Sequence, residues 1–112
     1  MPPKPNILII RKERKHIIDE KKQVIMGAPD LAIEILSPGS IRRDRMEKKD
    51  LYEQFGVAEF WIVAPNNKSV EVYSLQENRY KVFAFAAETG KVQSSVLDGF
   101  ELEVAGIFSD SI

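Results

Sequence analysis

The sequence contains no cysteine and a single histidine, His16. The lack of cysteine excludes disulfide bonds and thiolate metal ligands. The lone histidine stands among charged residues, so we expect neither a histidine-based metal site nor a histidine-dependent catalytic triad. A chain without cysteine is compatible with the reducing cytoplasm, which is where we expect this protein.

The chain also lacks a long apolar run and a strong excess of charge of one sign. Its apolar runs are far shorter than the ~20 residues that cross a membrane as a helix, and the start, MPPKPN, has no signal-peptide pattern. A formal net charge of -1 provides no overall attraction to nucleic acid or to an acidic membrane. With 112 residues and 44% hydrophobic residues, we expect one soluble domain over residues 1–112, with no membrane partner.

The order of apolar segments and turn residues predicts an α/β fold with a mixed sheet. Residues 44–55 predict a flanking helix, with Asp44 and Glu47 as a capping box and Gly56 as the stop. The charged segment 11–23 is interpreted as a short helix or an exposed connection. Strands are predicted at residues 6–10, 31–36 and 59–64, and an antiparallel meander at 69–75 and 79–86, followed by short extended pieces and a possible last helical turn.

The strand at 31–36 carries an acidic residue where apolar residues are expected. In GAPDLAIEILSP, residues 27–38, Glu34 is surrounded by alanine, leucine and isoleucine. Because the segment does not alternate, both of its faces should be covered, as in the centre of a sheet. A carboxylate removed from water is costly unless it is paired, hydrogen-bonded or bound to a metal. Glu34 therefore needs a partner.

Lys48 is the partner that helical periodicity suggests. Leu51, Tyr52 and Phe55 define the apolar face of the predicted helix, and Lys48 lies on that face one turn earlier. The helix should pack back over its sheet, so Glu34 and Lys48 can meet. Such a pair suits metal-assisted phosphodiester hydrolysis, with Mg²⁺ on the carboxylate and the lysine stabilising charge or orienting water. A structural ion pair is the alternative, and periodicity alone favours it.

A metal site usually needs a second oxygen ligand, and Asp30 is the nearest carboxylate. Four residues along a strand place its Cα ~13 Å from that of Glu34, too far for two ligands that lie ~2.1 Å from one Mg²⁺. Either the strand bends, or Asp30 satisfies backbone donors at the strand entrance. Asn6, at the start of a candidate neighbouring strand, is the other option, although an amide oxygen is a weaker ligand.

A basic cluster precedes the helix and could contact the phosphates of a substrate. It consists of Arg42, Arg43 and Arg45, close in sequence to Lys48. Cations of this kind bind the nucleic-acid backbone without reading its sequence. A solvated helix entrance is an equally good interpretation of the same residues.

Three segments together resemble a known family: GAPDLAIEILSP, RRDRMEKKDLYEQFGVAEFWIV and VEVYSL. They are similar to the Uma-type putative restriction endonuclease family, which belongs to the restriction-endonuclease-like PD-(D/E)XK superfamily, and the resemblance runs from about Pro5 to Phe108. It implies a restriction-endonuclease-like core and a metal-dependent nuclease site. By this resemblance Glu34 is the acidic residue of the E-x-K half-motif, Lys48 is a lysine relocated to the helix, and Asp30 is the Asp of the family's PD.

The chain departs from the family pattern at several acidic positions. Asn6 and Ala64 stand where members often have aspartate, and members have a longer amino-terminal segment that contributes another acidic residue. We therefore expect a truncated copy that binds Mg²⁺ weakly. The apolar surface left uncovered should find a partner, for example a second copy in a homo-oligomer.

Two functional hypotheses follow. The first is an Mg²⁺-dependent endonuclease, impaired by weak metal binding, that hydrolyses DNA phosphodiesters. The second is a catalytically inactive homologue that acts as an oligomeric interaction module or binds nucleic acid. If Asn6 and Glu34 face each other on paired strands, the site is recognisable but altered; if they do not, Asp30 is again the candidate for the second ligand.

Overall fold

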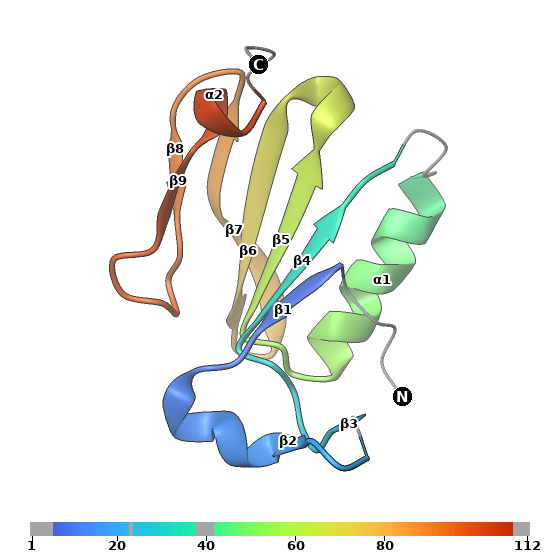
Figure 1. Ribbon diagram of the computed structural model, residues 1–112. Coiled ribbons are helices and arrows are strands. Elements are labelled where there is room, and N and C mark those ends of the chain that lie inside the picture. The colour runs from blue at the N-terminus through green and yellow to red at the C-terminus, as the bar shows by residue number, and fades with distance from the viewer. Residues whose placement is uncertain (1–5, 23, 38–41, 109–112) are drawn as a thin grey trace.

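The computed structural model describes residues 6–22, 24–37 and 42–108, and its centre is a five-stranded mixed sheet (Figure 1). The strand order is β1-β4-β5-β6-β7. Strands β4 and β5 are parallel, and every other neighbouring pair is antiparallel. This arrangement confirms the predicted α/β class. The bounds of these strands are β1 Ile7–Ile9, β4 Leu31–Ile35, β5 Glu59–Ala64, β6 Ser69–Gln76 and β7 Arg79–Ala87.

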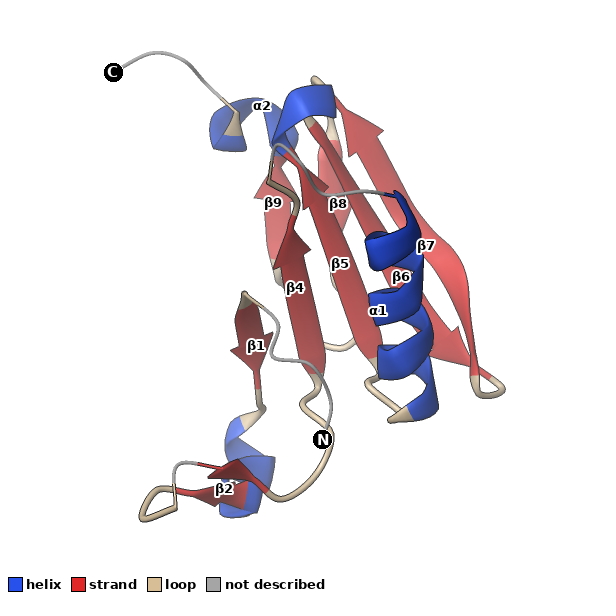
Figure 2. Cartoon of the chain, turned by 90° about the vertical axis from the view of Figure 1, so that its right-hand side faces the viewer, coloured by secondary structure: helices blue, strands red, loops and turns tan. Residues whose placement is uncertain are grey.

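Helix α1, Arg42–Gln54, connects the two parallel strands and packs on one face of the sheet (Figure 2). It begins two residues before the predicted start, so Asp44 lies in its first turn and not at its cap; arginine is a good helix former and does not stop the helix. Gly56, at a φ of 77°, adopts the left-handed conformation that closes the helix, as predicted. The buried side chains of this layer are Ala32, Tyr52, Val57, Phe60, Ile62 and Tyr80.

The opposite face of the sheet is covered by the carboxyl-terminal part of the chain. A hairpin of β8 (Lys91–Gln93) and β9 (Glu101–Glu103) and the short helix α2 (Val104–Ile107) lie on the side away from α1 (Figure 1). The side chains buried between them and the sheet include Leu31, Ile33, Trp61, Val70, Val72, Val92 and Val104. Strand β4 is therefore covered on both faces, which agrees with its lack of alternation.

The described residues of the charged segment, 11–22, form short elements beyond the amino-terminal end of β4. It contains a 3-10 helix, Lys12–Ile17, and the two-residue strand β2, Ile18–Asp19, which pairs with β3, Val24–Ile25. The predicted helix is thus shorter and tighter, and the small hairpin was not foreseen. Strands of two residues leave no periodic pattern in a sequence.

The segment between β5 and β6 is a tight turn. The segment after β5 forms a 3-10 turn, Pro65–Asn67, and Lys68 takes a positive φ of 50° before β6 begins. In the described part of the chain, no helix is both long enough and apolar enough to cross a membrane.

Candidate active-site pocket

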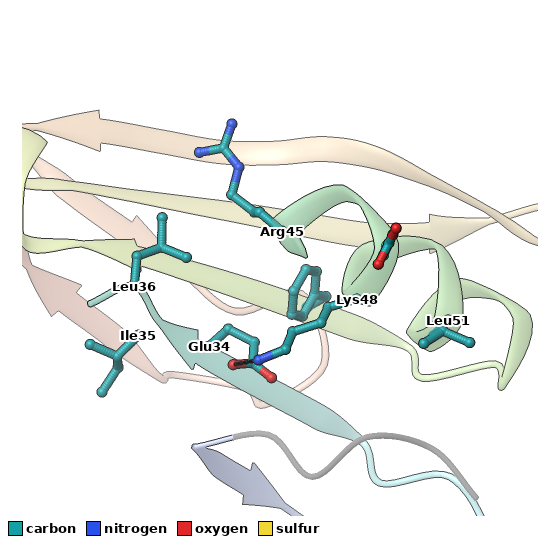
Figure 3. A pocket seen from close by; sticks show the side chains of 8 residues that line it. Glu34, Ile35, Leu36, Arg45, Lys48 and Leu51 are labelled. Atoms are coloured by element: carbon teal, nitrogen blue, oxygen red, sulfur yellow. Dashed lines mark hydrogen bonds and ion pairs between the residues drawn. The ribbon is translucent and has the colours of Figure 1, made fainter. Parts of the chain in front are cut away.

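Glu34 lies near the carboxyl end of β4, with its side chain on the face covered by α1. The carboxylate is almost completely buried and has two side-chain partners. Lys48 Nζ donates to Oε2 at 3.3 Å (Figure 3), and the Tyr52 hydroxyl donates to Oε1 at 2.8 Å. The structure thus brings Glu34 and Lys48 together, as the helical periodicity suggested.

Tyr52 is the partner that the sequence analysis missed, because it was assigned only to the apolar face of the helix. It follows Lys48 by four residues, so both side chains project from the same side of α1. A buried tyrosine hydroxyl nearly always has a hydrogen-bond partner, which is the feature that could have identified it. Burial, reinforced by the Glu34 carboxylate, raises the pKa of Tyr52 far above its ordinary value. The hydroxyl therefore remains a proton donor to Glu34.

A pocket of about 220 Å³ opens beside this pair. The Lys48 side chain is 44% exposed, whereas that of Glu34 is 6% exposed. The Lys48 side chain is therefore partly accessible to a solute in the pocket, whereas that of Glu34 is almost inaccessible. The residues that line the pocket are Glu34, Ile35, Leu36, Arg45, Glu47, Lys48, Leu51 and Phe60.

Of the three predicted phosphate-contacting arginines, Arg45 lines the pocket. Its guanidinium group points away from Glu34 (Figure 3). Arg45 also acts on Tyr73 of β6: burial and the neighbouring Glu71 carboxylate raise the pKa of Tyr73 to about 12, and the positive charge of Arg45 opposes that rise. Arg42 and Arg43 lie in the first turn of α1, but their side chains are outside the described part of the structure.

Asp30 is buried at the entrance of β4 and is held by the preceding segment. Its Oδ2 accepts the backbone N–H of Arg11 at 2.7 Å, and Arg14 donates to its Oδ1 at 2.8 Å. Burial alone would raise the pKa of Asp30, but these two partners outweigh it and hold the pKa below its usual value. Asp30 is not among the residues that line the pocket. It performs the backbone-satisfying role that the sequence offered as the alternative to metal binding.

Asn6 directly precedes β1, on the strand next to β4. The antiparallel register pairs Ile7 with Ile33 and Leu8 with Ala32, so its continuation places Asn6 opposite Glu34. The side-chain oxygen of Asn6 accepts the backbone N–H of Ile35 at 2.7 Å. Asn6 is therefore in the register position expected of a second ligand, but its oxygen is used by the backbone of β4.

The donor set decides what kind of cation this pocket can hold. Among residues 6–22, 24–37 and 42–108, no three Asp, Glu, His or Cys side chains gather closely enough to bind a metal ion. Mg²⁺ usually keeps several waters and takes only one or two carboxylates together with substrate phosphates. Glu34 fits that second arrangement, in which one carboxylate and the substrate share the ion, and it does not fit a cage built by the protein alone.

Comparison with known proteins identifies the family to which this chain belongs. The sequence matches the Uma2 family, described as "Putative restriction endonuclease", over residues 2–105. The chain belongs to the Uma2 family. Among solved structures it is similar to "a putative nuclease belonging to DUF820" from Anabaena variabilis, with a TM-score of 0.70 and 26% sequence identity. No curated protein matches the chain significantly.

The similarity to the Anabaena protein covers 94% of this chain and 59% of that one. The chain thus spans about three fifths of the length of that relative. Membership of the Uma2 family confirms the resemblance drawn from the sequence, and the five-stranded sheet with its helix agrees with the fold of the nuclease-like neighbour. Glu34 and Lys48 are the two positions carried over from the family pattern that the structure joins in one pocket.

Proposed function

We propose that this protein is a nuclease that hydrolyses DNA phosphodiesters with Mg²⁺ in the pocket between β4 and α1. The observation that supports the proposal is the Glu34–Lys48 pair: a buried carboxylate whose cationic partner is half exposed and opens into a pocket. Its place near the carboxyl end of a parallel strand is where open α/β sheets commonly bind their ligands. Membership of the Uma2 family supports the same function.

Each side chain of the pocket has a distinct part in this proposal. Glu34 would hold Mg²⁺ through the oxygen that faces Lys48; when bound, the ion supplies charge stabilisation at the phosphate and lowers the pKa of a bound water. The Lys48 ammonium would bind a phosphate oxygen and stabilise negative charge that develops on it. Arg45, with Arg42 and Arg43, would add positive charge along the DNA backbone. Asp30 would support the strand, since its oxygens already hold Arg11 and Arg14.

The proposal includes a cytoplasmic homodimer. On the described surface, Leu8 of the edge strand β1, Leu51 of α1 and Phe55, which follows α1, are large apolar side chains that remain exposed. An exposed edge strand beside exposed apolar side chains favours association with another chain. Sedimentation or light scattering of the purified protein would show a dimer; a monomer at all concentrations would contradict this part of the proposal.

Metal binding is the test of the central claim. Titrating MnCl₂ while following the melting temperature, with and without a short DNA duplex, should show a rise in the wild type that is larger with DNA. Glu34→Gln keeps the size of the side chain and removes its charge, so the rise should disappear. No rise in the wild type, or the same rise in Glu34→Gln, would remove the metal site. A DNA cleavage assay of both proteins then measures activity.

The second candidate function, an inactive homologue that binds other chains or nucleic acid, is favoured by Asn6. A carboxylate at this position would face Glu34 across paired strands, whereas the amide is held by the backbone of Ile35. Asn6→Asp separates the two functions. If the pocket is a weakened nuclease site, this variant should bind Mn²⁺ several-fold more tightly and cleave DNA faster than the wild type. If neither changes, the inactive module is the better description.

A further inference from the structure

The two oxygens of the Glu34 carboxylate have different surroundings. Oε1 accepts the hydrogen bond of the Tyr52 hydroxyl at 2.8 Å, on the side of the buried core. Oε2 lies 3.3 Å from Lys48 Nζ, whose side chain is partly exposed and lines the pocket. One oxygen is therefore held by a buried hydroxyl, and the other lies beside a partly exposed lysine side chain that lines the pocket.

Tyr52 can hold this orientation because its own position is fixed. The side chain is completely buried, and its ring packs against that of Phe60 with 5.1 Å between the ring centroids. Phe60 belongs to β5, the strand next to the one that carries Glu34. A hydroxyl on a ring fixed in this way cannot follow a rotating carboxylate, so rotation of the Glu34 carboxylate would break the hydrogen bond inside a dry environment, which is costly.

We propose that Tyr52 is a positioning residue that limits Glu34 to binding a divalent cation through Oε2 alone, and thereby favours Mg²⁺ and Mn²⁺ over Ca²⁺. The inference rests on the proposed function, because it concerns the same pocket. Mg²⁺ takes single oxygens in a near-ideal octahedron, whereas Ca²⁺ accepts six to eight oxygens and commonly uses both oxygens of one carboxylate. A carboxylate that presents only one oxygen suits the first ion better than the second.

Tyr52→Phe is the direct test, with Tyr80→Phe as its matched control. Tyr80 belongs to the same buried cluster, and its hydroxyl donates to the backbone oxygen of Val57 at 2.7 Å, away from Glu34. Each variant loses one buried hydroxyl that donates a hydrogen bond, so both should lose comparable stability. The measurement is the dissociation constant of MnCl₂ and of CaCl₂, each titrated to millimolar concentrations by calorimetry and by melting temperature.

Tyr52→Phe should lower the ratio of Mn²⁺ affinity to Ca²⁺ affinity about 10-fold, which is the scale on which partners of a metal ligand act. Tyr80→Phe should leave the ratio as it is in the wild type. A merely structural tyrosine would change the melting temperature of both variants without changing the ratio. An unchanged ratio in Tyr52→Phe would therefore overturn the inference.

The wild type provides a second measurement that does not depend on a core variant. The part of the melting-temperature rise that Glu34→Gln removes should be larger with Mn²⁺ than with Ca²⁺ at equal concentration. An equal or larger rise with Ca²⁺ would overturn the role of Tyr52 and leave the metal site standing. No rise with either ion would overturn both the role of Tyr52 and the proposed function, so the two failures are distinguishable.

Discussion

Strands β4 and β5 carry two buried carboxylates, Glu34 and Glu59, which differ in how completely protein donors surround them. Glu59 begins β5 and is completely buried on the face covered by the β8–β9 hairpin. It accepts hydrogen bonds from Trp61 Nε1, from both the hydroxyl and the N–H of Ser95, from the Ser94 hydroxyl and from the N–H of Val96. Within the described residues, Glu34 has two side-chain partners, Lys48 and Tyr52, and the Lys48 side chain lines a pocket.

The difference between the two carboxylates matches a structural role for Glu59 and the proposed chemical role for Glu34. Glu59 is enclosed by donors of the protein, which satisfy its lone pairs and fasten the turn after β8 to the sheet. Nothing from solution is needed to stabilise it. The Oε2 atom of Glu34 is paired with Lys48, whose side chain is 44% exposed and could be displaced by a phosphate or a cation. A buried charge whose partner can leave is the more suitable one for binding.

The largest effect on stability should come from Glu59→Ala. The change removes five hydrogen bonds and leaves buried donors of the turn without an acceptor, so we expect a loss of about 3–5 kcal/mol in the free energy of unfolding. Urea unfolding followed by the fluorescence of Trp61 measures it. Glu103→Ala, at an exposed position of β9, is the control and should change little. A loss as small as that of the control would show that Glu59 does not fasten the turn.

A smaller effect is expected at Asp30, the third buried carboxylate, and it should depend on pH. The folded protein lowers the pKa of Asp30 below 3.8, so the unfolded chain binds the proton first as pH falls. The stability that the ionised group contributes is complete above that value and is lost as pH falls through the lower, folded pKa. Asp30→Asn should therefore cost about 2 kcal/mol at neutral pH.

The measurement for Asp30 is the difference in unfolding free energy between the wild type and Asp30→Asn across a pH series. Other carboxylates titrate in both proteins, so the difference isolates this residue. It should shrink at pH values below 3.8. If the difference in unfolding free energy stays constant from neutral pH to pH 3, the stability contributed by Asp30 does not come from its ion pair with Arg14.

The smallest effect on stability should come from Glu34→Gln, although it should be the most damaging to function. The amide oxygen can still accept the hydrogen bond of Tyr52, and Lys48, released from its partner, can extend into water. We expect a change of about 1 kcal/mol or less. The same urea experiment measures it, and Mn²⁺ binding should be lost at the same time. If Glu34→Gln lowered the free energy of unfolding as much as Glu59→Ala, Glu34 would be a structural residue like Glu59.

Part of the site could be predicted because both of its charges interrupt a regular pattern. Glu34 interrupts an apolar strand and Lys48 interrupts an apolar helix face, and a short connection brings the two elements together. The strand at 59–64 was predicted with its observed bounds for the same reason: a continuous apolar run between turn residues. Local patterns of this kind are visible without knowledge of the fold.

The surroundings of Glu59 could not be predicted in the same way. Its donors at Ser94 and Ser95 lie 35 and 36 residues further along the chain, and serine in a turn gives no sign of a distant acceptor. Helical periodicity predicts that Tyr52 faces the sheet, but it does not predict the hydrogen bond from its hydroxyl to Glu34. The role of Asp30 was left open between a ligand and a backbone anchor, because only the path of residues 11–14 shows which donors reach it.

The sequence by itself determined that this is an α/β protein resembling the Uma2 family, and it predicted that one carboxylate on a strand and one lysine on the following helix can meet. The fold class and the possible meeting of these two residues follow from short-range periodicity, which the order of residues encodes directly, whereas the family follows from the resemblance of three longer segments. Only the tertiary structure decided which oxygen of Glu34 each partner takes, that Asn6 gives its oxygen to the backbone, and that Glu59 is enclosed. Those outcomes depend on donors brought together from distant segments, and a buried charge is stabilised by whichever donors the fold places around it.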